Sequence, residues 1–119
     1  MAKGEKRQLT RMPLETVVSL HGKNKMGVGF SENISLQGMF INTNDPFKPG
    51  SRLGMRFILP NEIRLLKTSG VVCWNRDFGD SMSNGLPGMG VKFVDLQPND
   101  HRMLARYLRT RNEASISET

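Results

Sequence analysis

The chain has 119 residues, 37% of them hydrophobic, and carries 17 Lys and Arg against 11 Asp and Glu, a formal net charge of +6. This size and composition fit one soluble domain with a single core, and they exclude a chain that is disordered throughout. The longest uninterrupted apolar run, residues 71–74, is too short to span a membrane, and the single cysteine, Cys73, cannot form an internal disulfide, so we expect a cytoplasmic protein.

The chain begins with a polar, basic arm over residues 1–11 that shows no apolar periodicity. Short β-type runs follow, separated by Gly, Asn, Asp and Pro turn residues. They span residues 14–20, 26–34, 39–43, 52–59, 63–75 and 89–94. The stretch 76–88 has no periodicity and is predicted to be a mobile loop. Strands at such close spacing predict an antiparallel barrel or sandwich.

A C-terminal helix is predicted to begin at Pro98, because proline is favoured in the first helical turn and Asp100 complements the helix dipole. One apolar stripe of this helix should pack on the barrel. The stripe consists of Met103, Leu104, Tyr107 and Leu108. The predicted organisation is therefore an arm over residues 1–11, a folded body over 12–111 and a flexible tail over 112–119.

The excess positive charge lies at the two ends of the chain. Residues 1–25 hold six Lys or Arg and two Glu, a local charge of 6 − 2 = +4, and residues 101–119 hold four Arg and two Glu, a local charge of 4 − 2 = +2. Residues 26–100 carry seven charges of each sign and are neutral. A neutral body with basic ends favours an anionic ligand that meets the arm, although terminal charges also serve solubility alone.

Signatures of catalysis are absent from the sequence. His21 and His101 lie far apart, and neither has a metal-ligand spacing with Cys73. The chain has no G-x-x-x-x-G-K-[ST] motif, no complete dinucleotide fingerprint and no nucleophile motif such as G-x-S-x-G. We therefore expect no enzyme activity, no metal and no cofactor.

A first binding motif lies in the arm. Arg7 and Arg11 are four residues apart, about 13 Å in an extended chain, and a turn would bring them closer. Their planar guanidinium groups suit a phosphate or the acceptor edge of guanine. This spacing is weak on its own, because two arginines four apart occur often.

A second motif ends the second predicted strand. Asn33 and Ser35 alternate onto one face there, and Ile34 between them points into the core. Gly38 leaves out a Cβ where the backbone turns or a ligand comes close. The alternative is an ordinary turn, since Asn, Ser and Gly are the usual turn residues.

The combination of R-x-x-x-R before the first strand and N-x-S-x-x-G at the end of the second resembles the PilZ domain family of bacterial cyclic di-GMP receptors. Further runs agree with that family at residues 50–53, 57–60, 70–74 and 88–93. The resemblance covers about residues 5–111. It implies a mostly β fold, a six-stranded antiparallel β-barrel with a C-terminal α-helix, and no catalytic activity.

The resemblance also implies roles for the motif residues. Arg7 and Arg11 would grip the phosphates and the guanine Hoogsteen edge. Asn33 and Ser35 would contact a guanine and a nearby phosphate, and Gly38 would permit the close approach. Asn33 stands where Asp is commoner, a variant that the family accepts.

Lys6 and Trp74 are two further candidates. Lys6 precedes the first motif arginine, and its added cation would favour two stacked ligands over one. Trp74 lies at a strand end and could stack on a guanine, whereas a tryptophan of a barrel more often belongs to the core.

The expected function is therefore a cyclic di-GMP receptor whose arm becomes ordered when ligand binds, and which signals to an effector protein in motility, exopolysaccharide or chemosensory control. We expect a monomer or weak homodimer without membrane insertion. One alternative is a PilZ adaptor that has lost nucleotide binding. Another is an RNA-binding barrel, suggested by the pI of about 10.0 and residues 25–30. That barrel would need several aromatic residues on one face, where only Phe30 occurs.

Overall fold

The computed structural model describes residues 12–60, 62–76 and 86–117. The predicted arm and most of the predicted loop, residues 77–85, lie outside the described residues.

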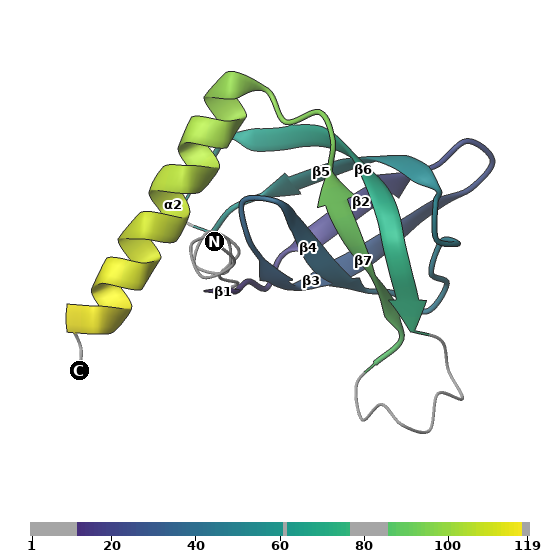
Figure 1. Cartoon of the computed structure of the whole chain (residues 1–119), viewed down its shortest axis with the longest axis horizontal. Coiled ribbons are helices and arrows are strands. Elements are labelled where there is room, and N and C mark those ends of the chain that lie inside the picture. Colours follow the sequence, from purple (N-terminus) through teal and green to yellow (C-terminus); the bar gives the residue numbers. More distant parts are fainter. Residues whose placement is uncertain (1–11, 61, 77–85, 118–119) are drawn as a thin grey trace, which may run out of the picture.

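The described chain forms a closed antiparallel β-barrel with one extra strand (Figure 1). The strands are β1 (Met12–Pro13), β2 (Val17–His21), β3 (Met26–Ile34), β4 (Gly38–Asn42), β5 (Arg52–Ile58), β6 (Leu65–Arg76) and β7 (Gly88–Phe93). Their order is β1-β3-β2-β5-β6-β7-β4, and β3 also pairs with β4, which closes β2 to β7 into a ring. The predicted six-stranded barrel is therefore confirmed, and β1 is an addition that the sequence pattern did not indicate.

The core fills the inside of the barrel with the inward-facing side chains of all six barrel strands. Its largest fully buried members include Leu20, Ile34, Met39, Met55, Phe57 and Leu66. Residues that alternate with them face outward, as expected for strands with one buried face. The inward direction predicted for Ile34 is confirmed, because its exposed fraction is 0%.

Two β-bulges interrupt this alternation. In β3 the register shifts between Ser31 and Asn33, and in β6 it shifts between Val72 and Trp74. Each bulge adds one residue to its strand, so the side chains that follow it exchange faces. Without the second bulge, Trp74 would share the inward direction of the buried Val72.

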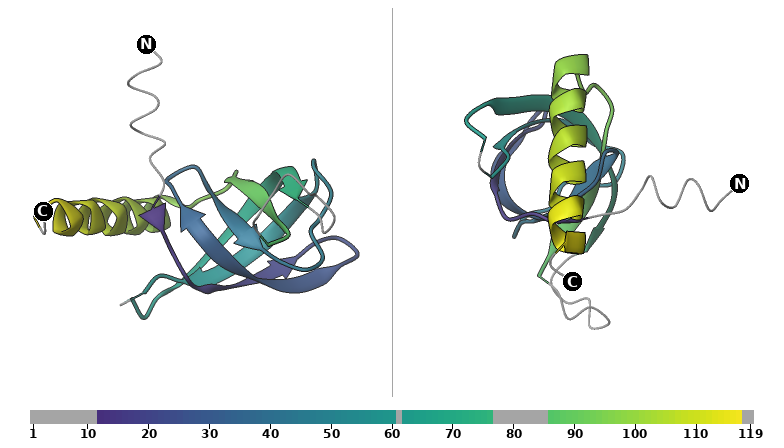
Figure 2. Two further views of the ribbon diagram at one scale, coloured as in Figure 1. Left: turned by 90° about the horizontal axis from the view of Figure 1, so that it is seen from below. Right: turned by 90° about the vertical axis from the view of Figure 1, so that its left-hand side faces the viewer.

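The helix α2 (Pro98–Ser117) lies across one end of the barrel (Figure 2). The predicted apolar stripe is its packing face, because Met103, Leu104 and Tyr107 are buried in the core cluster and Leu108 packs against it. Near its first turn, Arg64 donates to the buried Asp100 over 2.7 Å. The helix continues through residues 112–117, where the sequence pattern predicts a flexible tail, since no Gly or Pro ends it there.

Within the described ranges, none of the helical sequence combines the length and hydropathy that a bilayer crossing requires. The same residues contain no cluster of three or more His, Cys, Asp or Glu that could hold a metal ion.

Candidate functional site

The second sequence motif forms a tight turn between β3 and β4. The Ser35 amide donates to the Gly38 carbonyl over 2.8 Å, and the Gln37 amide donates to the Ser35 hydroxyl over 3.2 Å. The Gln37 carbonyl accepts from the amide of Phe93 over 2.8 Å, which attaches the turn to β7. Ser35 is only 1% exposed, so its hydroxyl serves first to shape this turn.

Gly38 is required by the contact between β4 and β7. A Cβ at this position would lie 2.1 Å from the carbonyl oxygen of Val91, which is far below any real contact. The missing side chain therefore allows two backbones to approach. The sequence pattern predicts that Gly38 leaves space for a turn of the backbone or for a ligand. The close contact between β4 and β7 is by itself a sufficient reason for glycine at this position.

Asn33 faces away from the core because of the bulge in β3. Before the bulge, Ser31 is buried, and after it Ile34 is buried, so the intervening Asn33 turns outward. Asn33 is half-buried and lies opposite Phe40 of β4 on one side and Pro13 of β1 on the other.

Trp74 is turned outward in the same way by the bulge in β6. The residue is 48% exposed, and its ring stacks on Phe40 with a centroid separation of 5.1 Å and an interplanar angle of 26°. The ring lies over Gly90 of β7, where a Cβ would be 2.4 Å from the indole Nε1. Trp74 is therefore an outer-surface residue with an accessible part, and its alternative assignment to the core is wrong.

Arg76 lies against the same Phe40 ring on which Trp74 stacks. Its guanidinium carbon lies 4.6 Å from the centroid of the Phe40 ring, and its Nε donates to the Leu86 carbonyl over 2.8 Å. Glu32 lies 3.8 Å from the same guanidinium group. Phe40 thus remains only 5% exposed although it faces outward, because Trp74 and Arg76 lie against it.

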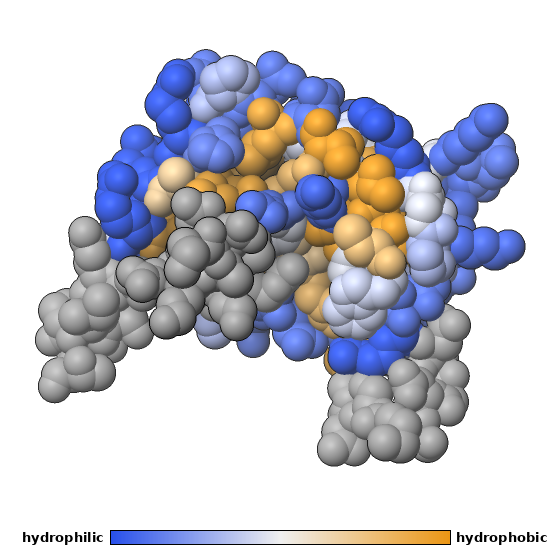
Figure 3. Space-filling view, viewed as in Figure 1, coloured by the Kyte–Doolittle hydropathy of each residue, from blue (hydrophilic) through white to orange (hydrophobic). Residues whose placement is uncertain are grey.

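A pocket of about 250 Å³ connects the motif turn with the indole. Its walls include Ser35 and Gly38 from the turn, Cys73 and Trp74 from β6, and Gly90 and Lys92 from β7. Hydrophobic residues gather over β6 and β7 on the face shown in Figure 3, with hydrophilic residues around them. The pocket therefore offers an aromatic surface, a turn and one cation, Lys92, whose side chain is exposed.

The arm joins the barrel beside this pocket. In β1, Met12 pairs with Ile34 and Pro13 pairs with Asn33, at the end of β3 that leads into Ser35. The buried hydroxyl of Ser31 donates to the Leu14 carbonyl over 2.6 Å and accepts from the Thr16 amide over 3.0 Å. These bonds fix the point at which the arm leaves the barrel.

Lys6, Arg7 and Arg11 lie outside the described residues. The chain length bounds their reach, since Arg11 directly precedes Met12 and Arg7 lies five residues from Met12. An extended chain covers at most about 3.6 Å per residue, so the Cα of Arg7 is within about 18 Å of Met12. That both motif arginines contact the pocket stays a prediction.

The structure adds residues that the sequence reading did not select. Lys92 lines the pocket, Phe40 stacks on Trp74, and Arg76 lies over the Phe40 ring. Lys92 stands directly opposite Gly38 in the register of β4 and β7. That pairing joins segments far apart in the chain, so no local signal could have indicated it.

The sequence also matches a known protein family. The PilZ domain model matches residues 5–110 of the sequence. The chain therefore belongs to the PilZ domain family. A search of curated proteins finds no match.

Solved structures share the fold. The Bacillus subtilis inhibitor of motility (MotI/DgrA) aligns with a TM-score of 0.74 and 24% identity over 91% of this chain and 52% of that one, so this chain spans about half its length. The PilZ domain with c-di-GMP of YcgR from Escherichia coli aligns at 0.67 and 14% identity, over 95% and 96% of the two chains. The PilZ domain of CeSA from a cellulose synthesizing bacterium aligns at 0.58 and 15%, over 87% and 98%.

Proposed function

We propose that this chain is a cyclic di-GMP receptor whose site lies between the arm and the pocket at Ser35, Trp74 and Lys92. The observation that carries the proposal is the position of Trp74. A bulge turns it out of the core, and a glycine, Gly90, leaves space for its ring beside the attachment of the arm. The c-di-GMP in the structure of the YcgR domain, a member of the same family, supports the choice of ligand.

The chemistry of the ligand matches these groups. Cyclic di-GMP presents two guanine rings and two phosphates, and an exposed indole is a stacking surface for a base. Lys92 is a cation for one phosphate, and the guanidinium groups of Arg7 and Arg11 can bind phosphate or the O6 and N7 edge of guanine. Asn33 would accept guanine N–H groups through its neutral amide oxygen.

The arm is the proposed switch. It would be mobile without ligand and ordered over the pocket with ligand, which creates a surface for an effector protein. The structural relative MotI is an inhibitor of motility, which favours motility control as the process that this receptor serves. Lys6 would supply a further cation, so we propose two stacked ligands per site. The receptor would have no catalytic activity.

Isothermal titration tests the proposal with cyclic di-GMP, the linear GMP dinucleotide and single-stranded RNA in parallel. We expect cyclic di-GMP to bind with a stoichiometry of two. Arg7→Ala and Arg11→Ala should each weaken binding by at least about tenfold, since a charge-assisted hydrogen bond contributes about 1.5–3 kcal/mol. Arg109→Ala, which removes an exposed arginine of α2, is the matched control and should bind as the parent does.

Three other titration results would each contradict a part of the proposal. No heat with cyclic di-GMP up to millimolar concentration would overturn the receptor proposal and favour an adaptor without nucleotide binding. Stronger binding of RNA than of cyclic di-GMP would identify a nucleic-acid-binding barrel. One ligand per chain would overturn the proposed pair and leave the receptor function intact.

A further inference from the structure

A second surface lies on the outer side of β3, β2, β5 and β6, and it shares no lining residue with the pocket at Trp74. The strand register arranges its side chains in rows. One row contains Val28, Ser19, Arg56 and Lys67, which are direct partners from strand to strand. A neighbouring row contains Met26, His21, Gly54 and Ser69.

Apolar side chains border the row that contains Arg56 and Lys67. Val17 pairs with Phe30, and Ile58 pairs with Leu65. The Thr16 hydroxyl donates to the Ile58 carbonyl over 2.8 Å, which joins the two pairs into one row across four strands.

The apolar exposure is concentrated on this face. Six of the ten large hydrophobic side chains that are exposed in the described residues lie on it. They are Val17 (54%), Met26 (72%), Val28 (59%), Phe30 (59%), Ile58 (43%) and Leu65 (42%). Single exposed apolar residues are ordinary, whereas a contiguous group bordered by polar residues marks an interaction surface.

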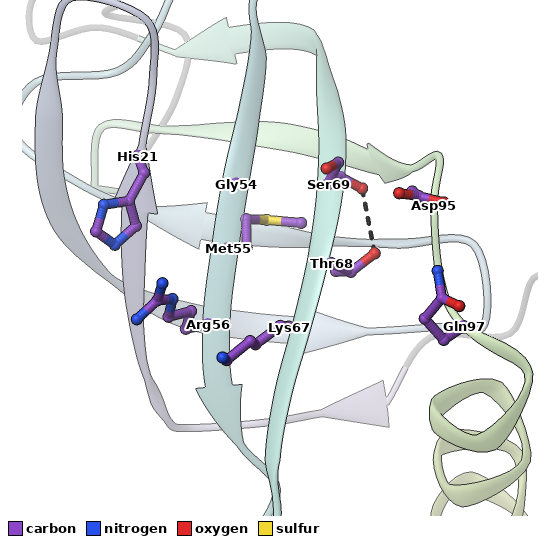
Figure 4. Close-up of a pocket in the computed structure, with 9 residues that line it drawn as sticks. All are labelled: His21, Gly54, Met55, Arg56, Lys67, Thr68, Ser69, Asp95 and Gln97. Carbon is purple, nitrogen blue, oxygen red and sulfur yellow. Dashed lines mark hydrogen bonds between the residues drawn. The ribbon is translucent and has the colours of Figure 1, made fainter.

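Arg56 and Lys67 carry unbalanced charge at the centre of this face. They stand directly opposite each other on β5 and β6, an arrangement that destabilises a sheet (Figure 4). Within the described residues neither has an ion pair or a side-chain hydrogen bond. Asp95 lines the same depression, and no cation lies within 4.0 Å of its carboxylate in the part of the chain described.

A depression of about 300 Å³ lies beside the two cations. Its floor is open at Gly54, where the nearest atom to an added Cβ would be the His21 carbonyl oxygen at 3.8 Å. The face therefore combines a hollow, the neighbouring cations Arg56 and Lys67, which have no ion pair among the described residues, and a row of apolar side chains.

We propose that this face docks a segment of a partner protein in which two carboxylates lie beside apolar side chains. The carboxylates bind Arg56 and Lys67, and the apolar side chains cover the row from Phe30 to Leu65. Charge complementarity selects this occupant, because an acidic segment neutralises a like-charged pair that has no ion-pair partner among the described residues. The proposal does not rest on nucleotide binding.

The same features weigh against other occupants. In a symmetric dimer whose two-fold axis passes through the Arg56 and Lys67 pair, these cations would meet the same cations of the second copy. A nucleic acid needs a run of cations and several stacking rings, whereas in the described residues the row of Arg56 and Lys67 contains only these two cations and no aromatic ring. Strand addition is also excluded, because β2 and β5 are paired on both edges.

Selection from a displayed library of random 12-residue peptides tests the proposal on the full chain. Peptides are selected on the parent protein and depleted on an Arg56→Gln, Lys67→Gln double variant. We expect enriched peptides to carry paired Asp or Glu next to Leu, Ile, Val or Phe. A synthetic copy of one such peptide, labelled with a fluorophore, then serves as the probe for fluorescence polarisation.

Three sets of variants separate the contributions. The Arg56→Gln, Lys67→Gln pair and the Val17→Thr, Ile58→Thr pair should each weaken peptide binding by at least about tenfold. Gly54→Val, which fills the depression without changing charge, should weaken it as well. Lys48→Gln with Arg109→Gln removes two exposed cations elsewhere and should leave binding unchanged.

Several outcomes would overturn the proposal. The library could yield no enriched peptide, or enriched peptides without acidic residues. Sedimentation could show a dimer that the Val17→Thr, Ile58→Thr variant lacks, which would assign the face to a second copy. Binding of single-stranded RNA or of anionic phospholipid vesicles that requires Arg56 and Lys67 would assign it to a polyanion.

Discussion

The indole of Trp74 lies on the backbone of Gly90, so closely that a Cβ on Gly90 would be 2.4 Å from Nε1. Glycine at position 90 therefore holds the ring flat against β7 and stacked on Phe40. The accessible part of the indole is the surface that a planar ligand would meet.

Trp74→Ala should weaken cyclic di-GMP binding about five- to 150-fold, because base stacking on an aromatic side chain contributes about 1–3 kcal/mol. The chain has one tryptophan, so its fluorescence reports this site directly and should change when ligand binds to the parent protein. Gly90→Ala should weaken binding in the same direction by displacing the ring. Gly27→Ala, where a Cβ would meet no atom within 4 Å, is the control. Unchanged affinity in Trp74→Ala would remove the indole from the site.

Gly38→Ala should destabilise the barrel by about 1–3 kcal/mol or more, because its Cβ would overlap the Val91 carbonyl oxygen. Urea unfolding measures this loss, and Gly54→Ala, which has no atom closer than 3.8 Å, should retain the parent stability. If Gly38→Ala kept the parent stability and lost only affinity for cyclic di-GMP, Gly38 would instead be needed to leave space for the ligand.

Ser31→Ala should lower the free energy of unfolding by about 1–3 kcal/mol, because it leaves the buried Leu14 carbonyl and Thr16 amide without their hydroxyl partner. It should also weaken cyclic di-GMP binding, since these bonds fix the exit of the arm. Thermal unfolding and titration of the same variant test both effects. A stable variant with looser binding would separate the two roles, whereas parent-like binding in a destabilised variant would contradict the link to the arm.

Lys67→Glu should stabilise the protein by about 0.2–1 kcal/mol, because it places a carboxylate directly opposite the guanidinium group of Arg56. The same substitution should abolish binding of the acidic peptide described above. Chemical denaturation and fluorescence polarisation measure the two effects, and Lys48→Glu is a control with the same charge change at another exposed site. A loss of stability in Lys67→Glu would mean that the two cations are not in conflict in the free protein.

Hydrogen exchange over residues 3–12 should slow when saturating cyclic di-GMP is added, since we propose that the arm becomes ordered over the pocket. Affinity should lie nearer micromolar than picomolar and should fall as salt rises, because the arm attracts phosphate through exposed charge. Equal exchange with and without ligand would place the switch elsewhere. The exchange of β5 residues, which neither pair with β1 nor line the pocket, provides the internal control.

The sequence predicts the barrel well because its strands alternate and its turns contain Gly, Pro and Asn. The segment 26–34, for example, coincides with β3. The apolar stripe of the helix is also predicted, since Met103, Leu104 and Tyr107 follow helical spacing. Local patterns of this kind depend on neighbours in the chain, which a single sequence displays.

The site was harder to predict because its geometry depends on pairings between distant segments. Nothing near Gly38 in the chain indicates that the Val91 backbone lies against it. Likewise, the direction of Trp74 depends on an irregular register with β7, and Lys92 joins the pocket only through its place opposite Gly38. The motif arginines stay a prediction, since they lie outside the described residues.

The bulge before Trp74 also affects how sequences of this family should be aligned. In a relative that has no extra residue at this point of β6, an ungapped alignment would put an inward-facing residue in the same column as Trp74. Equivalent columns would then compare core positions with outward-facing ones, and a hydrophobic core residue would be mistaken for an exposed aromatic ring. A one-residue gap at Cys73 restores the correspondence, so structural register, not residue type, should decide which relatives keep an aromatic surface here.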